Sequence, residues 1–208
     1  MRMFVCKLVA VAGALAAVAA WPGTALAQLS GATSATSGTS TTGSGQASAS
    51  TAVVMGIVTS LVDTGTLTDP SEPLGAGLPT GSIPGLLTAD SLHATTMGWT
   101  DQVASQASLS NLAMTVAGTG ISADFIQSSA LAVSGAAPTG VASIEGLSIG
   151  GVPVSFSGAP NQSISLPGLT VILNQQIQSA SGIIVNALRV TSLDGLTDVV
   201  VGSAKAGM

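Results

Sequence analysis

Short alternations of apolar and polar residues recur along the chain, most clearly in its last third. A period of two is typical of a β-strand, whereas a helix needs apolar residues three and four apart. The 26 glycines also disfavour long helices, by about 1 kcal/mol for each glycine in a helix interior. The pattern predicts short strands at Val152–Phe156, Ser163–Leu166, Leu169–Leu173, Ile183–Val190 and Asp198–Ala204.

The first half of the chain gives weaker signals. Residues Ala52–Val62 are rich in Val and Ile, which favours a strand over a helix. Residues Asp63–Gly85 hold four prolines and five glycines without a period, so we expect a long loop or an edge meander. The best helical candidate is Asp101–Ala117, although Thr and Gly close it quickly.

One five-residue phrase, Ser-(Leu/Ile)-x-(Gly/Asn)-Leu, occurs five times. The copies begin at Ser82, Ser108, Ser143, Ser165 and Ser192. The third residue is Pro in two copies, where its fixed φ suits a tight turn, and the fourth is Gly or Asn, which tolerate a positive φ. The phrase therefore predicts tight turns between apolar residues.

A second repeat, (Ser/Thr)-Ala-Asp-x-(Leu/Ile), occurs at Thr88–Leu92 and at Ser122–Ile126, with a weaker echo at Asn186–Thr191. The irregular spacing of these copies argues against a solenoid, whose period is nearly constant. Strands of varied length joined by Gly/Pro turns are typical of a sandwich. The predicted fold is an all-β, antiparallel β-sandwich-like domain of short strands.

The N-terminus has the pattern of a secretory signal peptide. Arg2 and Lys7 precede an apolar run, and Ala25-Leu26-Ala27 is an A-x-A cleavage site. The predicted organisation is a cleaved signal peptide at 1–27, a flexible Ser/Thr/Gly/Ala-rich segment at 28–51, and a single β domain at 52–208. The chain's one cysteine, Cys6, lies in the signal peptide, so the mature protein would lack thiols and disulfides. We expect the protein to be exported to the extracellular space or the cell envelope.

Charge narrows the range of partners. After removal of the signal peptide, Arg189 and Lys205 are the only basic residues against nine acidic ones. Nucleic acid requires several basic side chains against its phosphates, so this composition excludes it as a partner. The same shortage argues against docking on anionic lipid. No apolar stretch after the signal peptide is long enough for a transmembrane helix.

Several segments follow one another in a familiar order. They are Thr88–Asp90, Gly150–Val154, Ala159–Asn161, Leu166–Gly168, Val171–Gln176, Ile184–Val190 and Asp198–Ala204. In this order they resemble the choice-of-anchor P family of exported bacterial surface proteins. The resemblance covers most of the β domain and implies a surface location, with different C-terminal anchoring tails in different members. This chain ends at Lys205–Met208 without a sorting motif, so we expect free secretion or non-covalent retention.

The sequence offers little for catalysis. A Ser-His-Asp arrangement would require His93, the only histidine, and Gly146-Leu147-Ser148-Ile149-Gly150 matches the G-x-S-x-G elbow. The elbow needs a helix after the serine, whereas a predicted strand follows here, and His93 precedes Ser148 in the chain. We therefore interpret the motif as a turn and His93 as a solvent-facing strand residue, and we predict no catalytic residues.

The sequence signals for a metal or cofactor site are equally weak. One histidine without cysteine cannot supply a zinc site. Calcium would have to use Asp63, Asp69 and Glu72, or Asp194 and Asp198, but no D-x-D-x-D-G series occurs. We interpret these as solvated loop acids and predict no metal and no cofactor.

Trp99 is the one residue singled out as a possible ligand contact. With Phe125 and Phe156 it makes up the aromatic content of the mature chain, and it is either a core anchor or an exposed platform for a sugar ring. The leading hypothesis is a non-enzymatic envelope or extracellular structural protein that associates with itself or mediates surface contact. The alternative is a β module that binds a glycan or another extracellular polymer, and a hydrolase comes third.

Overall fold

The computed structural model describes residues 43–69 and 72–208, which lie within one compact unit. The predicted signal peptide and residues 28–42 of the predicted flexible segment lie outside these residues. The described part consists of β-strands and connecting turns, with no helix. The strands are β1 Ser44–Val54, β2 Ile57–Asp63, β3 Leu74–Ile83, β4 Leu87–Gly98, β5 Gln102–Val116, β6 Thr119–Val133, β7 Thr139–Glu145, β8 Ser148–Ile149, β9 Val152–Pro153, β10 Gln162–Leu166, β11 Leu169–Gln178, β12 Gly182–Ser192 and β13 Thr197–Gly207.

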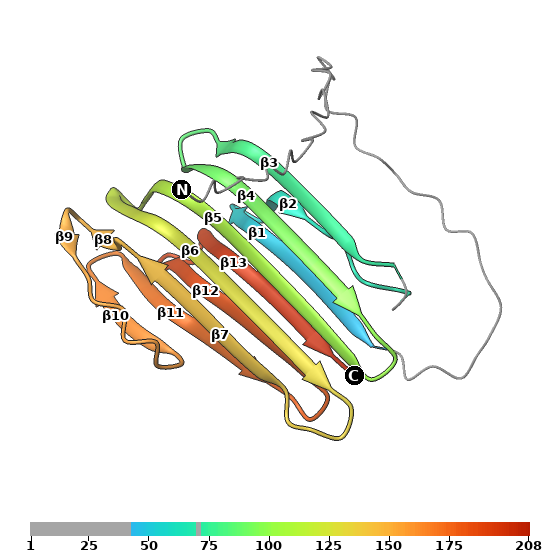
Figure 1. Ribbon diagram of the computed structural model, residues 1–208. Coiled ribbons are helices and arrows are strands. Elements are labelled where there is room, and N and C mark those ends of the chain that lie inside the picture. The colour runs from blue at the N-terminus through green and yellow to red at the C-terminus, as the bar shows by residue number, and fades with distance from the viewer. Residues whose placement is uncertain (1–42, 70–71) are drawn as a thin grey trace, which may run out of the picture. The chain divides into compact units, whose positions relative to one another are not determined.

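The strands form two antiparallel sheets that pack face to face (Figure 1). Sheet A has the order β10-β11-β12-β13-β1-β2, and sheet B has the order β3-β4-β5-β6-β8-β9. Strand β7 also pairs with β6, along Phe125–Leu131, while β8 pairs with Ile121 and Ser122 further along the same strand. The apolar faces of both sheets meet in one core. The predicted all-β, antiparallel sandwich is confirmed.

The core has a half lined by small side chains and a half lined by large ones. The first holds Ala47, Ala94, Ala107, Ala130, Ala132, Ala142, Ala204 and Ala206, and the second holds Leu112, Met114, Ile121, Leu169, Leu173, Leu188 and Val190. In the small half the sheets approach so closely that a methyl group added at Gly45 would lie 2.5 Å from Thr96 Cγ2. Here polar groups bridge the sheets: Ser105 Oγ donates to the Lys205 carbonyl at 2.7 Å, and Gln176 Nε2 donates to the Gly140 carbonyl at 3.0 Å.

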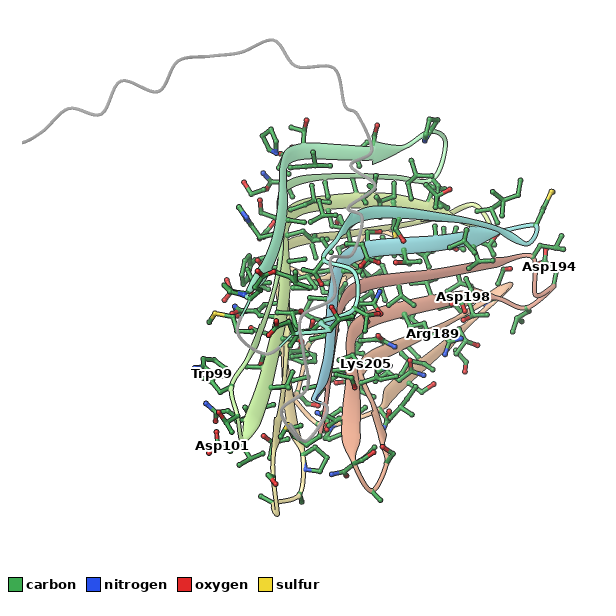
Figure 2. All side chains as sticks on the ribbon, turned by 90° about the vertical axis from the view of Figure 1, so that its right-hand side faces the viewer. Trp99, Asp101, Arg189, Asp194, Asp198 and Lys205 are labelled. Carbon is green, nitrogen blue, oxygen red and sulfur yellow. The ribbon has the colours of Figure 1, made fainter. Side chains whose placement is uncertain are left out.

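A row of residues with left-handed backbone conformation crosses each sheet midway along its strands. In sheet A these residues are Val62, Asn174 and Gly202, and in sheet B they are Ser91, Asn111 and Gly146, all with φ between 48° and 64°. A left-handed residue bends its strand and interrupts the alternation of faces. The strands of both sheets bend along their length in Figure 2, as such rows require.

In a regular strand, inward-facing residues are two positions apart. Where a strand crosses one of these rows, two successive inward-facing residues are three positions apart. The buried pairs are Ala47/Ser50, Ala89/Leu92, Leu109/Leu112, Ala123/Ile126, Ile144/Leu147, Val185/Leu188 and Val201/Ala204. The repeated Ala-Asp-x-(Leu/Ile) segments at Ala89 and Ala123 are two of these crossings. Their similarity therefore reflects a shared change of face within long strands.

The five copies of the Ser-(Leu/Ile)-x-(Gly/Asn)-Leu phrase share one local conformation. In every copy the fourth residue has positive φ, as predicted: Gly85, Asn111, Gly146, Gly168 and Gly195. Three copies are hairpin turns, between β3 and β4, β10 and β11, and β12 and β13. The copies that begin at Ser108 and Ser143 lie where strands cross the row of left-handed residues. The prediction of a tight turn is wrong for the Ser108 copy, which lies inside β5.

Residues 44–51 correct the predicted flexible segment, because they form most of β1, which pairs with β13 on one side and β2 on the other. The segment Ser44–Ser50 contains Gly, Ser, Ala and Gln without a large apolar residue. This composition suits a strand in the small half of the core, where Gly45 and Ala47 face sheet B at close range. The β domain therefore begins at least eight residues earlier than the predicted boundary at residue 52.

The structure also differs from the prediction in other elements. The helical candidate Asp101–Ala117 is strand β5. This strand lies between β4 and β6 in sheet B, and alternate side chains along it are buried. Residues Ala52–Val62 are the end of β1, a turn at Met55-Gly56, and most of β2. The segment Asp63–Gly85, expected to be a long loop or an edge meander, contains the edge strand β3, in agreement with the second alternative. The predicted strand Val152–Phe156 is reduced to the two residues of β9.

Candidate functional site

The structure separates the residues that would have to cooperate in hydrolysis. His93 is exposed on β4 and Ser148 lies on β8, with β5 and β6 between these strands in sheet B. Three strand spacings of about 4.8 Å place them well beyond hydrogen-bond distance. Ser148 is followed by a hairpin turn at Gly150-Gly151, and strand β9 follows that turn. The interpretations of the G-x-S-x-G match as a turn and of His93 as solvent-facing are confirmed.

Among the acidic residues considered for calcium, Asp63, Asp194 and Asp198 each have their own hydrogen-bond or ion-pair partners. No group of three or more His, Cys, Asp or Glu side chains suited to a metal occurs within residues 43–69 and 72–208. Asp63 accepts hydrogen bonds from Gln46 Nε2 and from the Gly65 amide. Asp194 and Asp198 lie on the β12–β13 hairpin but have separate partners.

Asp198 forms a bidentate ion pair with Arg189 on the outer face of sheet A. The Arg189 Nη2–Asp198 Oδ2 distance is 2.7 Å, and Nε donates to Oδ1 at 3.0 Å. The hydrogen bonds that Arg189 donates to Asp198 raise the pKa of Arg189 above its ordinary value. Hydrogen bonds from Ser192 and from the Leu196 amide lower the pKa of Asp194, so this carboxyl group stays ionised.

A polar groove crosses the outer face of sheet A, with a volume of about 340 Å³. Its amide, hydroxyl and carboxylate side chains pair largely with one another. Gln46 donates to Asp63, Ser203 Oγ donates to Asn186 Oδ1 at 2.8 Å, and Ser48 Oγ pairs with a neighbouring hydroxyl. Lys205 also lines the groove, and it is the one charged side chain there without a partner among the described residues, so the neutral groups have little left to offer a ligand.

Trp99 is exposed, and the core-anchor interpretation is therefore wrong. It lies at the end of β4 on the outer face of sheet B with 43% of its surface accessible, and its backbone amide donates to the Gln102 carbonyl at 2.8 Å. Figure 2 shows Trp99 and Asp194 at opposite ends of the sandwich.

A trough with a volume of about 310 Å³ lies beside Trp99 on the same face of sheet B. Two cross-strand rows form its floor, and their residues are paired in register across β4, β5, β6 and β7. The rows are Met97–Ala104–Leu131–Thr139 and Thr95–Gln106–Ser129–Val141. We call this surface the sheet B trough.

The opposite end of the sandwich carries the most exposed apolar residues. Met55, Ile57 and Val58 lie on the β1–β2 hairpin, and Leu193 and Leu196 lie on the β12–β13 hairpin, with exposed fractions between 48 and 75%. The Met55 amide donates to the Leu196 carbonyl at 2.8 Å, which joins the two hairpin tips. We call these five residues the tip cluster.

Sequence reasoning missed the tip cluster, although the sequence carried a signal. Hairpin turns are normally built from Gly, Pro, Asn, Asp and Ser. Here Met55 precedes Gly56 in a turn, and Leu193 and Leu196 enclose the Asp194-Gly195 turn. Large apolar residues at turn positions point to a surface with a partner, because folding by itself does not require them there.

No family model, curated protein or solved structure matches the chain. The resemblance to the choice-of-anchor P family therefore remains a prediction. Within the described residues, no helix has the length and apolar character needed to cross a membrane.

Proposed function

We propose that the chain is a non-enzymatic exported structural protein that associates with copies of itself through the tip cluster. The observation that carries this proposal is the exposure of five large apolar side chains on two hairpins that are hydrogen-bonded to each other. Contiguous apolar patches of this kind on soluble proteins mark interaction surfaces.

The shape of the β1–β2 tip supports a contact on more than one side. Ile57 and Val58 are consecutive residues of β2, so their side chains point to opposite faces, yet both are more than 60% exposed. The tip therefore stands clear of the sandwich. A second copy presents a surface of the same kind, so two tips meeting about a twofold axis would cover both faces.

Charge favours a protein partner of the same kind over an anionic surface. Asp194 is the one ionisable residue among the residues of the two turns, and its carboxylate is hydrogen-bonded within its own turn. The tips carry no basic residue that would attract phosphates. Association is then driven by apolar burial and should persist at high salt.

The expected affinity is low. The exposed fractions correspond to about three whole side chains per copy, so two tips would gain about 10–20 kcal/mol at most. Association itself costs about 4–15 kcal/mol. We expect dissociation constants in the micromolar to millimolar range, which suits a protein displayed in many copies.

Size-exclusion chromatography with light scattering on residues 28–208 tests this, from about 1 μM to about 1 mM, the range in which a weak dimer forms. The wild type should rise in mass with concentration, whereas the double variant Met55→Ser/Leu193→Ser should stay monomeric. Ile177→Ser is the matched control, because Ile177 is 49% exposed but lies at the end of β11 that is away from the tip cluster. A wild type that stays monomeric throughout, or an equal effect of both variants, would refute the proposal.

A further inference from the structure

The sheet B trough holds polar side chains that have no partner within the protein. Thr95, Gln106, Ser129 and Thr139 face outward, and their side chains make no hydrogen bond to any described residue. This distinguishes the trough from the groove on sheet A, where amides and hydroxyls pair with one another. Four neutral donor and acceptor groups are therefore available to a ligand in the trough.

A mainly apolar row lies beside a mainly polar row on the floor of the trough. Met97, Leu131 and Val141 are each at least 36% exposed and lie in the same two rows. Neighbouring residues within a row are about 4.8 Å apart from strand to strand, and the two rows are about 6.8 Å apart along the strands. The floor thus offers a strip of apolar contact beside a strip of hydrogen-bonding groups.

Trp99 extends the trough at one end. Thr95 and Met97 lie on the outer face of β4, opposite the fully buried Thr96. Trp99 directly follows β4, and its backbone hydrogen bond to Gln102 continues the β4–β5 ladder, so its exposed side chain lies on the same face. The exposed indole can stack against the apolar face of a ring, since aromatic faces attract C–H groups and its N–H can donate a hydrogen bond.

Charge selects the class of ligand. None of the residues that line the trough is ionisable. A phosphate, sulfate or carboxylate would lose hydration there without gaining an opposite charge. A neutral ligand with many hydroxyl groups and flat apolar faces fits both kinds of side chain, and at about 310 Å³ the trough is at the lower end of the usual range for ligand sites.

We propose that the sheet B trough is a binding site for a neutral polysaccharide chain, with Trp99 stacking on one sugar ring and Gln106 binding hydroxyl groups of another ring further along the chain. This site is independent of self-association, because Trp99 and the tip cluster lie at opposite ends of the sandwich (Figure 2). A protein with both surfaces would link copies of itself to an extracellular polymer.

Tryptophan fluorescence gives a direct readout, because Trp99 is the only tryptophan left after removal of residues 1–27. The probes are soluble neutral polysaccharides (a β-glucan, a mannan, a xylan and a dextran), with alginate as the acidic comparison. At least one neutral probe should change the emission and shield Trp99 from acrylamide. Affinity electrophoresis in gels that contain each probe measures retardation without relying on the indole.

Variants assign the site. Trp99→Ala should abolish retardation, and Gln106→Ala should weaken it about 3- to 10-fold, as expected for one hydrogen-bonding side chain. His93→Ala is the matched control, because His93 is exposed on the same face of β4 but lies outside the trough. Circular dichroism verifies that each variant is folded.

Three outcomes would overturn the proposal: no retardation by any neutral probe, binding of alginate alone, or unchanged binding by Trp99→Ala. The tip variant Met55→Ser/Leu193→Ser should retain full polysaccharide binding, and Trp99→Ala should retain self-association. Each proposal can therefore fail without the other.

Discussion

Replacement of Gly140 by alanine tests how closely the two sheets approach in the small half of the core. A methyl group at Gly140 would lie 2.2 Å from Val185 Cγ2 and 3.1 Å from Ile183 Cδ1. Carbon atoms normally pack at about 3.5–4.0 Å, so the methyl group would overlap Val185 by more than 1 Å. Gly140 has no left-handed backbone, so the effect is purely steric. Overpacking of this kind costs about 1–3 kcal/mol.

The same clash predicts a strong coupling with Val185, which is fully buried. Val185→Ala alone should cost about 1–3 kcal/mol, because it removes buried methyl groups and leaves a cavity. In that background the methyl group of Gly140→Ala enters the vacated space. Its cost should fall to nearly zero, which gives a coupling energy of about 1–3 kcal/mol in the double-mutant cycle.

Urea unfolding followed by far-UV circular dichroism measures these differences, provided that the m-value stays constant. Gly140→Ala should also lower Tm by about 2–4 °C for each kcal/mol lost. Gly120→Ala is the matched control, because Gly120 has no neighbour within 4 Å of the added methyl group and should change stability by less than about 0.5 kcal/mol. Equal costs of Gly140→Ala in both backgrounds would refute the close approach of the sheets.

Three further substitutions address single interactions. The pKa of Asp194 is lowered in the folded state, so the ionised carboxyl group stabilises the fold above its unfolded pKa of about 3.9, and this stabilisation is lost as the pH falls through the lower pKa of the folded state. Asp194→Asn should therefore lower Tm at pH 7 and make Tm less dependent on pH between about 5 and 3. Asn111→Ala should be less stable than Asn111→Gly by about 1 kcal/mol in urea unfolding, because φ is +49° at this position, and equal stabilities would contradict the left-handed conformation. Ser128 is fully buried and its hydroxyl has no partner among the described residues, so Ser128→Ala should keep or raise Tm by the equivalent of about 0–1 kcal/mol, whereas a clear loss would reveal a missed hydrogen bond.

Local signals in the sequence were sufficient for the strands of the last third and for the left-handed residues of the repeated phrase. The predicted strands Ser163–Leu166, Ile183–Val190 and Asp198–Ala204 lie within β10, β12 and β13, and Gly or Asn at the fourth position of the phrase predicted a positive φ at five places. These features depend on a few consecutive residues, since φ preference and face alternation are properties of the chain itself. The all-β class followed from the same signals.

The candidate sites were only partly visible. The sequence singled out Trp99, but it left open whether the indole is buried or exposed, because this depends on the face of sheet B on which Trp99 lies. The trough joins residues from β4, β5, β6 and β7, and no local pattern places Gln106 beside Thr95 and Ser129. The tip cluster likewise depends on the pairing of β1 with β13, which brings two distant hairpins together.

The sequence by itself determined where the chain turns and which residues of each short segment share a face. The tertiary structure decided what those faces meet. Ser44–Ser50 is part of an internal strand because close-packed sheets need small residues there, and inward positions are three apart because left-handed residues form a row across each sheet. Both results arise from contacts between strands far apart in the sequence, and such contacts determine which apolar and polar groups remain uncovered for a partner.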